Sequence, residues 1–111
     1  MTKGKQLLIN ADCENHLMYN SVYRVYELLE TLIKQFKRLT PPFVIRGTEN
    51  SPGLTAFIII DSSHISFHSF KDEKRIRIDI YSGKDFEHEM IIRFLKSEFR
   101  SKNFEWEIIE R

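Results

Sequence analysis

With 111 residues, this chain has the length of one domain, residues 1–111, and can bury a core of modest size. Its 17 basic and 16 acidic residues give a net charge of +1, so charge offers no argument for binding nucleic acid or a membrane. The one cysteine, Cys13, excludes an internal disulfide and fits a reducing compartment. Because no apolar run could span a membrane and the first residues lack a signal-peptide pattern, we expect a cytoplasmic protein.

The first half of the chain predicts a strand, a helix and an extended segment. Residues 5–11 form a short apolar run that is typical of a strand. Asn20 or Ser21 can cap a helix that runs to about Arg38 and ends before a pair of prolines. Its apolar stripe at helical spacing comprises Val22, Tyr26, Leu29, Ile33 and Phe36. The segment 43–53 then begins extended and ends as a loop.

Three strands follow with short turns between them, at residues 54–61, 63–70 and 75–82. The first of these has an all-apolar centre at residues 57–60, which predicts burial on both faces of the sheet. The other two alternate in polarity, which predicts a hairpin with one apolar face and one polar face.

Asp85 can cap a second helix to about Arg100, and residues 103–109 close the chain as a strand. The inward-facing residues expected for this helix are Phe86, Met90, Phe94 and Leu95. The resulting order, β-α-β-β-β-β-α-β, predicts an α+β fold. We expect a two-layer α/β sandwich, with a largely antiparallel sheet and two helices on one face.

The strand at 63–70 carries the residues with the most chemistry. Alternation places Ser63, Ile65, Phe67 and Ser69 on one face and His64, Ser66, His68 and Phe70 on the other. Ser63, His68 and Asp79 could form a hydrolase triad, although the sequence has no nucleophile elbow. Two histidines are too few for a metal site, so we expect no metal. A solvated sheet face without any chemistry is the alternative that spacing alone leaves open.

A longer motif runs through this strand as Ser62-Ser63-His64-Ile65-Ser66-Phe67-His68-Ser69-Phe70. It resembles the processing site of the small prokaryotic S-adenosylmethionine decarboxylase proenzymes, Glu-Ser-His-(Leu/Ile)-x-Ile-His-Thr followed by an aromatic residue. Upstream, Gly53-Leu54-Thr55-Ala56 is similar to the family's Gly-x-Ser-Gly. Downstream, Asp79-Ile80-Tyr81-Ser82-Gly83 is similar to Asp-(Val/Leu)-(Phe/Tyr)-Thr-Cys. The resemblance spans nearly the whole chain and marks a divergent member.

The resemblance implies a proenzyme that cleaves itself between Ser62 and Ser63. The Ser63 hydroxyl would attack the carbonyl of Ser62 to give an ester, and β-elimination assisted by His68 would leave a pyruvoyl group derived from Ser63. Thr55, where the family has Ser, would hydrogen-bond the intermediate. The pyruvoyl cofactor then serves as the electron sink for loss of CO2 from a small-molecule substrate. The default substrate is S-adenosylmethionine, in polyamine biosynthesis.

Several positions depart from the family pattern. Gly83 stands where the family has its proton-donating Cys, and Ser82 beside it is the remaining hydroxyl. In the substrate-binding set, Phe70 fits one of two adenine-stacking aromatic positions, Glu49 occupies the other, and Asp72 would be the ribose-binding acid.

These departures leave three alternatives open. The substrate could instead be a basic amino acid such as arginine or ornithine, with Glu49 facing its cationic side chain. The chain could be a non-catalytic paralogue that binds or regulates a partner, or an unrelated α+β protein. By resemblance, we expect a homodimer in which the polar sheet faces pack together.

Overall fold

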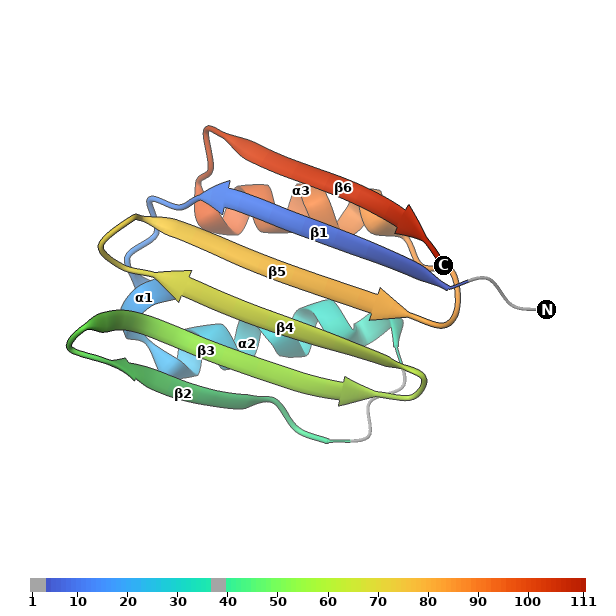
Figure 1. Cartoon of the computed structure of the whole chain (residues 1–111), viewed down its shortest axis with the longest axis horizontal. Coiled ribbons are helices and arrows are strands. Elements are labelled where there is room, and N and C mark those ends of the chain that lie inside the picture. Colours follow the sequence, from blue (N-terminus) through green and yellow to red (C-terminus); the bar gives the residue numbers. More distant parts are fainter. Residues whose placement is uncertain (1–3, 37–39) are drawn as a thin grey trace.

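A computed structural model describes residues 4–36 and 40–111. Its elements, in chain order, are β1 (Lys5–Asp12), α1 (Leu17–Asn20), α2 (Val22–Leu32), the 3-10 helix η1 (Ile33–Gln35), β2 (Phe43–Thr48), β3 (Ser51–Ile60), β4 (Ser63–Phe70), β5 (Arg75–Ser82), α3 (His88–Phe99) and β6 (Phe104–Glu110). The six strands of the described residues form one antiparallel sheet, and the helices lie on one of its faces (Figure 1). The predicted α+β sandwich is confirmed.

The strand order across the sheet is β2-β3-β4-β5-β1-β6. Strands β2 to β5 are joined by successive hairpins, and β1 is inserted between β5 and β6 (Figure 1). Antiparallel neighbours joined by short turns need no crossover, which explains why four consecutive strands lie side by side. The β1 strand instead pairs with segments from the second half of the chain.

The face of the sheet that carries the helices holds the core. Ile76, Ile78 and Ile80 alternate along β5 and are fully buried there. On the opposite face, which the described part of the chain leaves open, Phe57 is 40% and Ile59 is 43% exposed. The prediction that both faces of β3 are buried is therefore wrong for this chain, because helices cover only one side of the sheet. We call this second surface the open face.

The first helical region differs from the expected single helix. Ser21 does cap α2, since its hydroxyl accepts a hydrogen bond from the N–H of Arg24 at 3.1 Å. A separate turn, α1, precedes this cap, and α2 gives way to η1 at Ile33. The buried stripe of α2 is Val25, Leu28, Leu29 and Leu32, so the predicted stripe was shifted, with Val22 and Tyr26 at its margin. The expected end of this helix falls on residues 37–39, outside the described part.

The second helix begins two residues later than expected. Its N-cap is Glu87, and Asp85 lies in the preceding loop, where its carboxylate accepts from the N–H of Phe86 at 2.9 Å. Met90 is 55% exposed and does not face the core, whereas Leu95 does. The buried residues of α3 are Ile91, Ile92, Leu95 and Phe99. Within residues 4–36 and 40–111, no helix is both long and apolar enough to cross a membrane.

Candidate functional site

The residues singled out by the sequence fall into two groups at opposite ends of the sheet. One group, which we call the serine end, lies at the β3–β4 turn and the end of β5 and comprises Ser62, Ser63, Ser82 and Gly83. The other, which we call the histidine group, lies toward the far end of β3 and β4 and comprises Thr55, His68 and Phe70. The turns that carry the serine end lie at the right in Figure 1.

Ser63 and Ser82 are direct cross-strand neighbours at the serine end. Both point to the helix-bearing face and are buried, with 9% and 2% of their surface exposed. Side chains opposite one another in an antiparallel pair have Cβ atoms about 4.5–5.5 Å apart. Both residues line a cavity of about 280 Å³ that also contacts Lys84. The hydroxyl of Ser82 accepts a hydrogen bond from the N–H of Lys84 at 3.1 Å.

The peptide bond between Ser62 and Ser63 lies where the β3–β4 turn joins β4. Ser62 is the second residue of a two-residue turn and has φ of 60°, in the left-handed region. Glycine or asparagine normally occupies such a position, and a left-handed conformation costs other residues about 1–3 kcal/mol. The carbonyl oxygen of Ser62 accepts a hydrogen bond from the N–H of Gly83 at 2.9 Å. The candidate cleavage site thus combines a strained residue with a hydrogen-bonded carbonyl.

Lys5 anchors the loop that borders the serine end. Its ammonium donates to the Asp85 carboxylate and to the main-chain carbonyl of Phe86, both at 2.7 Å, and lies 4.6 Å from the centroid of the Phe86 ring. The hydrogen bond from Lys5 lowers the pKa of Asp85, aided by the N–H of Phe86. Asp85 also lines the cavity that contains Ser63. This contact fixes the start of β1 to the segment that follows Gly83.

On the open face, Thr55 and His68 form a pair. The Thr55 hydroxyl and Nδ1 of His68 are 3.2 Å apart, and which of them donates depends on the tautomer of the imidazole. The Phe70 ring is stacked beside His68 with centroids 6.3 Å apart. The guanidinium of Arg77 lies 5.4 Å from the centre of the Phe70 ring. Thr55, which the resemblance assigns to the intermediate, therefore contacts His68 in the structure.

A second aromatic row crosses the open face beside this pair. Phe57 stacks on His64 with centroids 5.7 Å apart, and His64 contacts Tyr81 with centroids 5.6 Å apart. Sequence reasoning placed His64 on the polar face but missed Phe57, because it took that residue as buried. The signal that would have found it is the register of β3 against β4, in which Phe57 lies opposite Ser66 and therefore diagonal to His64.

Ser63 and His68 are not brought together within one chain. They lie on opposite faces of β4, and five residues of strand separate them by about 16 Å along its axis. The possible hydrolase triad of Ser63, His68 and Asp79 is therefore not assembled, since its serine points into the helix layer. Any chemistry that needs both Ser63 and His68 requires a second copy of the chain or a different conformation.

The predicted substrate-binding residues lie at the end of the sheet opposite Ser63. Glu49 is in the β2–β3 turn and Asp72 in the β4–β5 turn, and both are exposed. Phe70 and Asp72 border a small hollow of about 80 Å³ between these two turns. The structure thus places the three candidate residues at the histidine group's end and not at the serine end.

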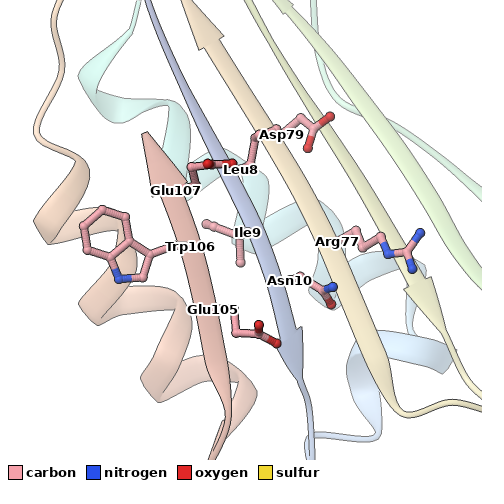
Figure 2. Close-up of a pocket in the computed structure, with 8 residues that line it drawn as sticks. All are labelled: Leu8, Ile9, Asn10, Arg77, Asp79, Glu105, Trp106 and Glu107. Atoms are coloured by element: carbon pink, nitrogen blue, oxygen red, sulfur yellow. The ribbon is translucent and has the colours of Figure 1, made fainter. Parts of the chain in front are cut away.

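A shallow hollow of about 370 Å³ crosses strands β5, β1 and β6, and Asp79 of the possible triad lines it. Figure 2 shows Arg77 and Asp79 on β5, with Glu105 and Glu107 on β6. Asn10 of β1 is held by Arg75, whose Nη2 donates to its Oδ1 at 2.6 Å. No group of three or more metal-ligating side chains occurs among residues 4–36 and 40–111.

Fold and site together define a class, an α+β sandwich with a serine-bearing hairpin at one end and an open sheet face. Residues 5–111 match the family model described as S-adenosylmethionine decarboxylase, and the chain belongs to that family. The crystal structure of the adenosylmethionine decarboxylase from Aquifex aeolicus VF5 is similar, with a TM-score of 0.83 and 19% sequence identity over 99% of this chain and 91% of that chain. At this identity the likeness establishes the fold alone. No curated protein matches the sequence.

Proposed function

We propose that this chain is a self-cleaving proenzyme of a pyruvoyl-dependent decarboxylase, with S-adenosylmethionine as its default substrate in polyamine biosynthesis. The Ser63 hydroxyl adds to the Ser62 carbonyl, the C–N bond breaks, and the nitrogen takes the proton, leaving an ester. A base then removes the Cα proton of Ser63 while the carboxylate of residue 62 departs. Tautomerisation and addition of water release ammonia and leave the pyruvoyl group at residue 63.

The observation that carries this proposal is the environment of the Ser62–Ser63 peptide. The strained φ of Ser62 raises the energy of the uncut turn, and the hydrogen bond from Gly83 polarises the carbonyl that is attacked. Ser63 lines a cavity of about 280 Å³, which leaves room beside its hydroxyl. When formed, the pyruvoyl group would supply the electron sink for loss of CO2.

The base for the elimination must come from outside the chain's own serine end, since His68 lies on the other face of β4. We propose a homodimer in which the open faces of two copies pack together. Four large apolar side chains on or beside this face are at least 40% exposed: Phe43, Ile45, Phe57 and Ile59. A cluster of exposed apolar side chains favours contact with a partner surface that buries it. A two-fold related copy would bring its Thr55–His68 pair toward the serine end of the first chain.

Two observations favour alternative functions. Gly83 stands where the family pattern has the thiol that returns a proton to the substrate. Glu49 places a carboxylate where the family pattern has an aromatic ring that stacks on adenine. A basic amino acid such as arginine or ornithine would use that carboxylate, which makes it the alternative substrate class. The missing thiol also fits a non-catalytic paralogue that binds or regulates a partner.

Intact-mass spectrometry of the purified protein tests self-cleavage directly. We expect fragments of residues 1–62 and 63–111, with the second beginning at a pyruvoyl group. The Ser63→Ala chain is the control and should remain uncut. A wild-type chain that stays at full length after prolonged incubation contradicts the proposal and favours the non-catalytic alternative. Release of CO2 from S-adenosylmethionine, arginine and ornithine then identifies the substrate of a cleaved protein.

A further inference from the structure

The main-chain N–H of Gly83 contacts the atom on which charge develops during self-cleavage. It lies 2.9 Å from the carbonyl oxygen of Ser62, the carbonyl that the Ser63 hydroxyl attacks in the proposed function. When the hydroxyl oxygen of Ser63 bonds to the carbonyl carbon of Ser62, the carbonyl oxygen of Ser62 becomes an oxyanion. It remains one until the C–N bond breaks and the proton passes to nitrogen. A donor 2.7–3.1 Å from an oxyanion is the geometry of an oxyanion hole.

We infer that the Gly83 N–H is a catalytic donor for self-cleavage, an inference that rests on the proposed function. The donor belongs to the backbone, so it is independent of the side chain at position 83. Loss of the family thiol at this position therefore leaves the donor to the oxyanion in place. The chain can retain self-cleavage while its proton donor for substrate turnover is altered.

The absence of a side chain at position 83 also shapes the site. A Cβ added there would lie 3.3 Å from both the Cβ and the carbonyl oxygen of Ser62, closer than ordinary contact. Ser62 itself holds φ of 60°, and the hydrogen bond from Gly83 is one of the contacts that fix this residue. Glycine thus permits a close approach of β5 to the peptide that is cut.

The same kind of hydrogen bond occurs elsewhere in the sheet, which provides a matched control. The N–H of Gly4 donates to the carbonyl of Arg111 at 3.0 Å, also at the end of a strand pair and also from a glycine. A purely structural role predicts that removing either N–H has the same consequence. A catalytic role predicts that only the N–H of Gly83 affects cleavage.

The test replaces Gly83 by glycolic acid in a chemically synthesised 111-residue chain, which exchanges the N–H for an ester oxygen and leaves the shape unchanged. We expect the first-order rate of cleavage to fall by about 10²- to 10³-fold, the usual effect of losing one oxyanion donor. The chain with glycolic acid at position 4 should cleave at the rate of the unmodified chain. Circular dichroism and urea unfolding establish that both modified chains are folded.

Three outcomes overturn the inference. Equal rates in the unmodified and Gly83-modified chains would remove only the role of Gly83, and equal slowing in both modified chains would make its role structural. An unmodified chain that never cleaves would remove the proposed function as well. Gly83→Ala keeps the N–H and adds only the Cβ, so its cleavage rate measures the effect of crowding near Ser62 separately from the loss of the hydrogen bond.

Discussion

Position 83 is the residue at which the proposed motif match departs most from the family pattern in chemical terms. A glycine has no group to transfer a proton, and the adjacent Ser82 hydroxyl already accepts a hydrogen bond from the Lys84 N–H. A serine hydroxyl is also a far weaker acid than a thiol. The residues near the serine end therefore fit self-cleavage better than they fit rapid protonation of a substrate carbanion.

Replacing Gly83 by cysteine should restore the missing proton donor. We expect Gly83→Cys to raise decarboxylation of S-adenosylmethionine by about 10²-fold, the lower range for general acid catalysis. The measurement is release of CO2 under saturating substrate. Gly83→Ala is the control, because it adds the same Cβ near Ser62 without a thiol. Equal rates in these two variants would show that the thiol is not what this chain lacks.

His68 is expected to act in the second step of processing. Its Nδ1 is held by the Thr55 hydroxyl at 3.2 Å, which orients the ring. In the His68→Ala chain, the ester should form and accumulate, because its elimination has lost the base. Hydroxylamine cleaves esters and not peptides, so brief treatment should release residues 1–62 from this variant. A His68→Ala chain that resists hydroxylamine and stays uncut would place His68 in the first step, and one that is fully processed would place it outside the reaction.

At the scale of the elements, Asp12 connects the end of β1 to the segment between α3 and β6. Its Oδ1 accepts from the Ser101 hydroxyl at 2.6 Å and from the N–H groups of Lys102 and Asn103 at 2.9 and 2.8 Å. The hydrogen bond from Ser101 is the largest of the causes that lower the pKa of Asp12. The Asp12 carboxylate thus accepts three hydrogen bonds from the loop that joins α3 to β6.

Asp12→Ala should lower the free energy of unfolding by about 0.5–1.5 kcal/mol, because it removes hydrogen bonds whose exposed N–H donors can turn to water instead. A carboxyl whose pKa is lower in the folded state contributes stability above its unfolded value of about 3.9, and this contribution disappears as pH falls through the folded pKa. Urea unfolding at pH 7 and pH 3 should therefore show a larger difference between wild type and Asp12→Ala at pH 7. An unchanged difference would contradict the assigned role.

The elements differ in how well the sequence predicts them, for physical reasons. Strands β4 and β5 have the predicted bounds, because period-two alternation and a charged turn specify register without reference to the rest of the fold. The helix predicted from Ser21 does begin there, but the preceding turn α1 was not predicted, since it has no side-chain cap that the sequence could reveal. The apolar run of β3 was misread, because a run of apolar residues does not say what covers its second face.

The candidate site shows the same limit at the scale of the whole molecule. The sequence named Ser63, Ser82, Thr55 and His68 from the motif but did not predict which of them are neighbours, whereas the antiparallel register of the structure pairs Ser63 with Ser82 and Thr55 with His68. Alternation placed Ser63 and His68 on opposite faces of one strand, but it could not show that the two pairs lie at opposite ends of the sheet. The positions of the two pairs along the sheet depend on the direction and pairing of the strands. They divide the one expected site into two half-sites.

A site built from two copies can be tested by mixing two inactive chains. In the proposed dimer, a Ser63→Ala chain still offers His68, and a His68→Ala chain still offers Ser63. Coexpression should therefore lead to complete processing of the His68→Ala chain alone, which differential tags make visible in intact-mass spectra. Each variant expressed by itself is the control. If the mixture stays unprocessed while dimers form, His68 does not act across the interface.

The strand order has a consequence for what the proposed cut leaves behind. Residues 1–62 contribute β1, which is hydrogen-bonded between β5 and β6 of the other fragment, and also β3, which pairs with β4. The two products are thus interleaved at three strand boundaries and share one core. We expect native mass spectrometry to find them as a single particle that separates only in denaturant. Maturation would convert one chain into an interlocked pair of chains without dismantling the sheet.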